Sequence, residues 1–194
     1  MLYSLSRAIR RLLLLATAVI IIALAVSLTP YPWRLLYPLS HQELIIKEAR
    51  AAKLDPSLVA AIINVESHWQ TSAISSKGAK GLMQLMPTTA DWIASKLGKD
   101  TVNEQDLFLP EINIHLGVCY FADLLAQFNN NATIALAAYN GGRGNVKNWL
   151  DSDVWDGSDD TIESIPFGET RRYVQKVVTQ QKIYSRIYKW STDS

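Results

Sequence analysis

The chain has 194 residues, of which 48% are apolar and 19% are charged, with 9 Gly, 7 Pro and 1 Cys. This length suits one domain or one domain with an appendage, and the low Gly, Pro and Cys counts exclude collagen, low-complexity disorder and a disulfide-stapled miniprotein. A net charge of +1 provides no basic excess for a phosphate backbone, so we expect no nucleic-acid partner. The lone Cys119 forms no zinc-binding pattern with the three histidines, so we expect no metal and no cofactor.

The first thirty residues differ in composition from the rest. Three arginines precede an apolar stretch from Leu12 to Thr29, which as a helix spans roughly 27 Å, enough for a thin hydrocarbon core. The basic flank places the remaining chain outside the cytoplasm. A cleaved signal peptide is the alternative, with a small-x-small site at Ala23-Leu24-Ala25, and a buried core helix is a third. We favour an uncleaved anchor over residues 1–30 because apolar residues continue through Leu28.

Residues 31–39 indicate a short aromatic linker. It contains Tyr31-Pro32-Trp33 and Tyr37-Pro38, whose rings either lie at the membrane interface or pack on the domain. Without residues 1–30, the chain carries 16 Lys and Arg against 18 Asp and Glu. Residues 40–190 are numerous enough to bury a full core, and we expect them to form one exported, monomeric domain.

Helix start signals open this domain. Ser40-His41-Gln42-Glu43 is a capping box that predicts a helix to about Lys53. Asp55-Pro56 is an N-cap followed by Pro at the first helical position, which predicts the next helix. That helix places apolar residues on one stripe together with one acid. The members of the stripe are Leu58, Ile62, Val65, Glu66 and Trp69.

The rest of the chain also favours helices. We expect them at Thr88–Leu97, Glu111–Phe128, Thr133–Tyr139 and Thr170–Tyr188. Residues 151–163 form a polar insertion whose acids fit the calcium-loop spacing poorly, so we expect a solvated loop there. Because no useful period-2 pattern occurs, the sequence predicts an all-α fold.

Glu66 needs a chemical explanation. It lies on an apolar helix stripe, near a helix C-terminus where the macrodipole disfavours an anion. Desolvation and the dipole both raise the pKa of such a carboxyl, which favours a general acid. The alternative is an edge glutamate that bends to solvent. Residues 75–87 then form a Gly-rich loop with Gln84 and two methionines, which by itself is more typical of a core turn than of a binding site.

Four segments in order carry a specific resemblance. They are Val65-Glu66-Ser67, Gly81-Leu82-Met83-Gln84-Leu85-Met86-Pro87, Ala138-Tyr139-Asn140-Gly141-Gly142 and Ile165-Pro166-Phe167-Gly168-Glu169-Thr170-Arg171-Arg172-Tyr173-Val174. Together they resemble the family 1 lytic transglycosylases of bacterial cell walls, whose catalytic domain is goose-lysozyme-like. The resemblance covers about residues 40–190. It implies a lysozyme-like helical domain. With the N-terminal transmembrane or signal-anchor helix expected from residues 1–30, this domain is expected on the outer face of the cytoplasmic membrane.

The resemblance also implies roles for seven residues. Glu66 matches the catalytic acid/base, and Tyr139 matches the tyrosine near it. The positions that match substrate-binding residues are Ser75, Gln84, Met86, Asn140 and Glu169. Two departures occur: Trp69-Gln70-Thr71 replaces a common aromatic-Asn-Pro, and Gly141 replaces a frequent Ala.

The implied substrate is the glycan of peptidoglycan. Glycosidases commonly need two carboxylates, but the sequence offers Glu66 no obvious partner. One acid suffices if the muramyl C6 hydroxyl attacks C1, which gives a 1,6-anhydro end without water. We keep two alternatives: a hydrolysing muramidase in which an acid such as Asp91 activates water, and a non-catalytic peptidoglycan-binding scaffold of the envelope.

Overall fold

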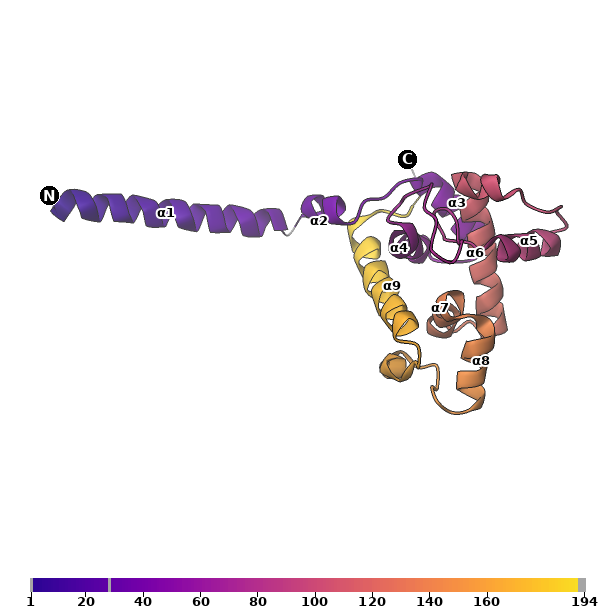
Figure 1. The fold of residues 1–194 in the computed structure, drawn as a ribbon. Coiled ribbons are helices and arrows are strands. Elements are labelled where there is room, and N and C mark those ends of the chain that lie inside the picture. Colours follow the sequence, from indigo (N-terminus) through magenta and orange to yellow (C-terminus); the bar gives the residue numbers. More distant parts are fainter. Residues whose placement is uncertain (1, 28, 192–194) are drawn as a thin grey trace.

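The computed structural model describes residues 2–27 and 29–191, with side chains from Ser6 onward. One long helix, α1 (Leu2–Ser27), projects from a body of shorter helices (Figure 1). Its segment Ser6–Ser27 has a mean hydropathy of 2.4, and no part of it is buried in the protein. By length and composition this segment can cross a membrane. The expected N-terminal apolar helix is therefore confirmed.

The body contains eight further α-helices and two short 3-10 helices among the described residues. They are α2 (Pro30–Leu36), α3 (Gln42–Ala51), α4 (Pro56–Ser67), α5 (Pro87–Lys96), η1 (Glu104–Phe108), α6 (Pro110–Gln127), α7 (Ala132–Gly141), α8 (Arg143–Asp151), η2 (Asp159–Ser164) and α9 (Gly168–Ile187). Within the described ranges, β-structure is limited to isolated bridges of Lys80 with Ile74 and Leu85. The all-α prediction is confirmed.

Helix α4 lies at the centre of the core. Asp55 caps it as predicted, since its side chain accepts a hydrogen bond from the Ser57 N–H at 2.8 Å, and Pro56 occupies the first turn. Every residue from Ser57 to Asn64 is buried, because α3 and α9 pack against this helix. Helices α3 and α9, from opposite ends of the helical body, therefore meet at α4, and α9 also packs on α7 (Figure 1).

Two local expectations are wrong. Helix α3 begins at Gln42 without a side-chain cap, because His41 precedes it in the left-handed region at φ 54. The capping box is therefore not formed. Helix α4 ends at Ser67, since His68 and Trp69 have φ values of 50 and 67. Trp69 thus leaves the predicted stripe, and from the following loop its Nε1 donates to the Tyr184 hydroxyl at 3.1 Å.

Two helices were not predicted. Helix α2 occupies most of the segment that the sequence indicates as a linker, and α8 follows the predicted Gly141-Gly142 stop directly. Both lie on the surface of the body, and α8 buries only Val146 and Trp149. The polar insertion also contains η2, whose start is held by Asp156, which accepts hydrogen bonds from the Ser158 N–H at 2.9 Å and from the Thr161 hydroxyl.

Candidate functional site

A cleft of about 220 Å³ opens beside the C-terminal end of α4. Its walls come from the end of α4, the loop that follows, the end of α7 and the start of α9. The lining residues are Glu66, Ser75, Ser76, Lys77, Ala79, Gln84, Met86, Tyr139, Asn140 and Glu169. All seven site residues predicted from the sequence line this one cleft.

The surroundings of Glu66 favour its protonated form. Its side chain is partly buried at the end of α4. Burial is the main cause that raises the pKa of Glu66, to about 7; the negative charge of Glu169 also raises it, and a hydrogen-bond donation from Tyr173 partly opposes the rise. Near neutral pH, Glu66 is therefore present in both protonated and ionised forms, as a group that must give and then take a proton requires.

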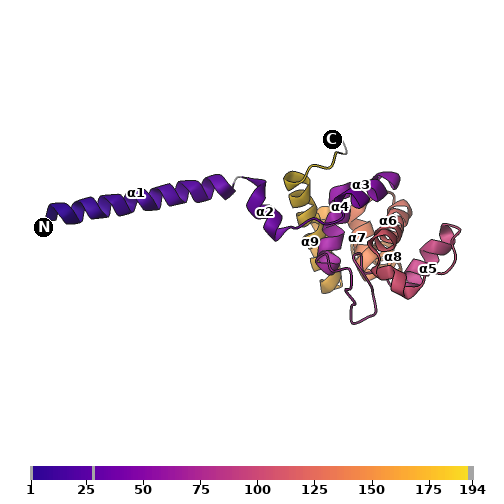
Figure 2. The same cartoon turned by 90° about the horizontal axis from the view of Figure 1, so that it is seen from above.

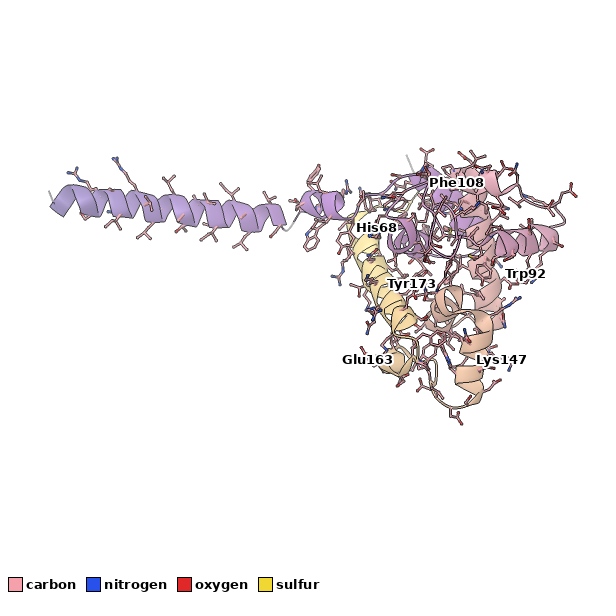
Figure 3. The ribbon with its side chains drawn as sticks, in the orientation of Figure 1. His68, Trp92, Phe108, Lys147, Glu163 and Tyr173 are labelled. Carbon is pink, nitrogen blue, oxygen red and sulfur yellow. The ribbon has the colours of Figure 1, made fainter. Side chains whose placement is uncertain are left out.

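Tyr173 is a site residue that sequence reasoning missed. It is buried on α9, one turn after Glu169, on the side of the helix that faces the body (Figure 3). Its hydroxyl lowers the pKa of Glu66 as a donor, but the geometry is not that of a complete hydrogen bond, and among the described residues the hydroxyl has no other partner. Its i, i+4 spacing from Glu169 in a matched motif was the sequence feature that could have indicated it.

Tyr139 connects α7 to the loop. Its hydroxyl donates to the Met83 carbonyl at 2.7 Å, so its proton is used on the loop and not on Glu66. Burial, followed by the charge of Glu66 in the same cleft, holds the pKa of Tyr139 well above its ordinary value. The ring packs against Tyr120 and Phe121, with centroids 5.2 and 6.1 Å away. Tyr139 thus holds Met83 and the cleft wall in place.

Hydrogen bonds within the loop shape the second wall. The Ser75 hydroxyl accepts from the Ala79 N–H at 3.0 Å, and the Ser75 N–H donates to the Ala79 carbonyl at 2.9 Å. Gln84, at φ 48, donates through Nε2 to the carbonyls of Ala73 and Gly81 at 3.2 and 2.9 Å. The amide nitrogen of Gln84 is therefore occupied by the loop, which leaves its oxygen for a ligand.

Asn113 on α6 anchors this loop from behind, and sequence reasoning missed it. Its fully buried amide accepts from the Met83 N–H at 2.7 Å and donates to the carbonyls of Lys80 and Leu107 at 2.9 and 2.7 Å. A Cβ on Gly81, which has φ +75, would collide with both Asn113 and the Leu107 carbonyl. A glycine is required at position 81 because the backbone there passes directly against the Asn113 amide. No sequence pattern around Asn113 indicated this role.

The third wall joins α7 to α9. Thr170 donates its hydroxyl hydrogen to the Asn140 side-chain oxygen at 2.8 Å, which orients that amide beside the cleft. A Cβ on Gly141 would lie 2.9 Å from the same hydroxyl oxygen, which explains why Gly replaces Ala here. At the mouth, Lys77 and Glu169 lie 3.9 Å apart and both are exposed. The cleft mouth therefore presents one cation and one anion to a ligand.

Asp91, the alternative second acid, is placed elsewhere. It lies on α5 and accepts a hydrogen bond from the Val102 N–H at 2.9 Å, and it does not line the cleft. This position rules out Asp91 as a base that activates water next to Glu66. Across the described part of the chain, no group of three or more His, Cys, Asp or Glu could hold a metal ion. The groups of the cleft that can exchange protons are its own carboxyl, hydroxyl and ammonium side chains.

Comparisons with known proteins identify the family of this chain. The family described as "Transglycosylase SLT domain" matches residues 43–162. The soluble lytic murein transglycosylase of Salmonella typhimurium is 38% identical over 152 residues, which cover 76% of this chain and 23% of that protein. The membrane-bound lytic murein transglycosylase C of Edwardsiella ictaluri is 34% identical over 168 residues, which cover 76% of this chain and 47% of that protein.

A solved structure shows the same fold. The lytic transglycosylase Slt of Pseudomonas aeruginosa, solved as an inactive Glu→Gln mutant, superposes with a TM-score of 0.72 and 40% sequence identity. The match covers 79% of this chain and 25% of that chain. The chain thus spans about a quarter of the length of the soluble relatives that it matches. The resemblance seen in the four sequence segments is confirmed.

Proposed function

The chain belongs to the transglycosylase SLT domain family, and from this premise we propose that it is a peptidoglycan lytic transglycosylase. It cleaves the β-1,4 bond between N-acetylmuramic acid and N-acetylglucosamine without water and leaves 1,6-anhydromuramyl ends. Glu66 is the acid/base. The observation that carries the proposal is the setting of Glu66, a partly buried carboxyl with a pKa of about 7 in the wall of the cleft.

The proposed reaction uses this one carboxyl twice. Protonated Glu66 first donates its proton to the glycosidic oxygen as the bond from that oxygen to the muramyl C1 breaks, and the N-acetylglucosamine side leaves with a new hydroxyl. The ionised carboxylate then accepts the proton of the muramyl C6 hydroxyl while that oxygen bonds to C1. The proton gained equals the proton lost, so no water is consumed. A pKa near the working pH suits both steps.

The other predicted site residues are proposed to hold the glycan. Ser75, Gln84, Met86 and Asn140 line the cleft with one hydroxyl, two amides and a thioether, which suit sugar hydroxyls, acetamido groups and an apolar sugar face. Glu169 lies at the mouth beside Lys77. We place it at the peptide or sugar groups of the substrate. Tyr139 positions the loop that carries these residues, through its hydrogen bond to Met83.

The proposed location is the cell envelope. The apolar helix Ser6–Ser27 and the basic residues before it support a membrane anchor with the domain on the extracytoplasmic side. The proposed division is residues 1–30 as anchor, 31–39 as connection and 40–190 as the catalytic domain. A membrane-bound relative in the same family supports this arrangement.

Mass spectrometry of released fragments tests the reaction. Purified sacculi are incubated with the full chain in detergent, and with Glu66→Gln as the control. We expect muropeptides lighter by one water than reducing-end muropeptides, and none from the control. A relative in the family is inactive as a Glu→Gln mutant, which supports this choice of substitution.

Two other outcomes of this experiment would overturn the proposal. Reducing ends would show a hydrolase, and Glu169 would then be the candidate base, because it is the other carboxylate in the cleft. A folded chain that binds sacculi and releases nothing would favour the scaffold. Circular dichroism measured on the same sample shows whether the helices are formed, and so distinguishes a folded scaffold from a chain that failed to fold.

A further inference from the structure

Helix α2 is fastened to the C-terminal end of α9. Arg34 donates from Nε and Nη2 to the Ile187 carbonyl at 3.1 and 2.9 Å, and its guanidinium lies 5.0 Å from the centre of the Tyr188 ring. The Tyr188 hydroxyl donates to the Tyr37 carbonyl at 2.8 Å. Figure 2 shows α2 between α1 and this end of α9. The segment after the anchor is therefore a docked element of the body.

The same helix is tied to the anchor. The Trp33 indole donates to the Ser27 carbonyl at 3.0 Å, and the Thr29 N–H donates to the Val26 carbonyl at 3.0 Å. Only two residues separate the end of α1 from the start of α2. Because each residue spans at most about 3.5 Å, α2 begins within roughly 10 Å of the point where α1 ends.

A cavity of about 370 Å³ lies where α2 meets α9. We call it the junction cavity, and its lining residues are Thr29, Pro30, Trp33, Ile183, Arg186 and Ile187. Its wall is mostly apolar, with one guanidinium and one hydroxyl. Arg186 is exposed and has no ion-pair partner in the part of the chain that the structure describes.

The surface around the junction cavity combines exposed apolar and cationic side chains. Tyr31, Leu35 and Leu36 on α2 are 73%, 85% and 70% exposed, which is costly in water for such large side chains. On the α9 side, Lys182, Arg186 and Lys189 are exposed. Lys182 and Arg186 are one helical turn apart and so share a face of α9.

We propose that α2 lies in the headgroup layer of the membrane and that the junction cavity binds an anionic phospholipid. The proposal rests on the membrane-spanning role proposed above for α1. Arg186 pairs with the lipid phosphate, and the apolar wall of Pro30, Trp33 and Ile183 covers the start of the acyl chains. A phospholipid is the occupant because the chain itself brings this cavity to the bilayer surface, within a few residues of the span.

This arrangement has a consequence for the catalytic cleft. Helix α9 has 20 residues, and it carries Glu169 of the cleft at its first turn and the junction cavity at its last turns. A helix of that length measures about 30 Å. Since α2 is docked and is not a free tether, the cleft stays at most about this distance from the lipid contact. We infer that the enzyme acts on glycan that lies close to the membrane surface.

Spin-label accessibility in the full chain tests the membrane contact. Cys119→Ser removes the native thiol, and single cysteines then replace Ile20 in α1, Leu35 in α2 and Ser95 on α5, which lies at the far side of the body (Figure 1). In vesicles containing phosphatidylglycerol and phosphatidylcholine, we expect label 20 to favour oxygen over an aqueous nickel chelate, label 35 to be intermediate, and label 95 to favour the chelate.

The three positions separate the possible failures. If label 20 is in the hydrocarbon and label 35 is as accessible to the chelate as label 95, the inference is overturned while the anchor stands. If label 20 is itself in water, the anchor and the inference fail together. Muropeptide release from sacculi is measured on the same samples, so the transglycosylase proposal is judged independently of both.

Native mass spectrometry tests the lipid site. The full chain is released from micelles that contain equal amounts of phosphatidylglycerol and phosphatidylcholine, and the bound lipid is identified. Arg186→Gln should lower retention of phosphatidylglycerol about fivefold, since one cation near the surface contributes about 1 kcal/mol. Lys147→Gln on α8 removes the same charge at the far end of the body and should change nothing (Figure 3).

Two results would contradict the lipid site. Equal loss in both variants would show a general charge effect, and equal retention would show that Arg186 does not hold the phosphate. Inorganic phosphate is added as a competitor. If it displaces the lipid at millimolar concentration, the cavity is a simple anion site and the assignment to a phospholipid is wrong.

Discussion

Glu66 and Glu48 are both carboxylates on core helices, but their surroundings differ in one respect. Burial raises the pKa of each. Glu48 on α3 also accepts from His115 Nδ1 at 2.7 Å and lies 3.4 Å from Lys47, and together these partners outweigh burial, so its pKa is lowered. Among the described residues no cation opposes burial at Glu66, and its pKa is raised to about 7; Lys77 in the same cleft lies 3.9 Å from Glu169. Burial therefore raises the pKa of a carboxyl only where no nearby cation outweighs it, as at Glu66 and not at Glu48.

The largest expected effect is on the cleavage rate, where substitution of Glu66 and of Glu48 should have different consequences. Glu66→Gln should lower the cleavage rate by roughly 10²–10⁴-fold with the fold intact, because an amide cannot donate and then accept the proton. Glu48→Gln is the matched control, and its rate should stay within a few-fold of the unchanged chain. Muropeptide release and circular dichroism measure both variants. If Glu66→Gln retains activity within tenfold, or Glu48→Gln loses as much, the assignment of the acid is wrong.

The next effect concerns positioning around Glu66. Tyr139→Phe removes the hydrogen bond to the Met83 carbonyl and so loosens the cleft wall. We expect turnover to fall by roughly 10–10³-fold, since misplacement of a reacting group by about 1 Å costs on the order of 10²-fold. Tyr188→Phe removes another tyrosine hydroxyl, one that donates to the Tyr37 carbonyl away from the cleft, and should leave turnover unchanged. An unchanged rate in Tyr139→Phe would make this residue part of the core alone.

The comparison of the two acids also shows which features the sequence could reveal. The Asp55-Pro56 start, the 3,4-spaced seam of α6 and the long α9 are local patterns, and they predicted these helices within two residues. The apolar helix stripe singled out Glu66, and the resemblance carried by the four segments assigned its role. The sequence could not show that Glu48 would meet His115, because the two lie 67 positions apart and nothing local pairs them.

The features that were missed depend on contacts between distant segments. Helix α2 is a short segment with two prolines. It is held in place because its Arg34 donates to the carbonyl of Ile187 in the last turn of α9. Asn113 reads as an ordinary polar residue on α6 until the loop at Met83 is placed against it. The expected capping box failed because His41 adopts a left-handed conformation ahead of α3. Tertiary contacts decided the positions of α2 and Asn113, and a single sequence does not contain them.

The contributions of Glu66 and Glu48 to the free energy of unfolding should depend on pH in opposite directions. The folded pKa of Glu66 lies above its unfolded value, so the stability it contributes is complete below about pH 4.5 and is lost as the pH rises through about 7. Glu66→Gln removes that loss, and we expect the variant to be more stable by roughly 3 kcal/mol at pH 8.5 and equal at pH 4.5. Urea unfolding of the full chain in detergent, followed by tryptophan fluorescence, measures the free energy of unfolding.

Glu48 should behave in the opposite way. Its folded pKa is lowered, so its contribution is present above its unfolded pKa and is lost as the pH falls through the folded value. Glu48→Gln should therefore cost about 1 kcal/mol at pH 6.5, because a neutral amide oxygen replaces the charged acceptor of His115. If both variants shift the free energy of unfolding in the same direction at pH 6.5, the two carboxylates do not differ as the structure indicates.

The smallest effect is the pH dependence of cleavage, and it reports Glu66 directly. The first step needs protonated Glu66, so the rate at limiting substrate should fall about tenfold for each pH unit well above 7. Tyr173→Phe removes the donor that lowers the pKa of Glu66, and so the midpoint of this fall should move to higher pH. A merely structural role for Tyr173 would lower the rate at every pH without moving the midpoint. Glu169→Gln gives the opposite control, because removing a nearby negative charge should lower the midpoint, and a profile that ignores both changes would show that another group controls the rate.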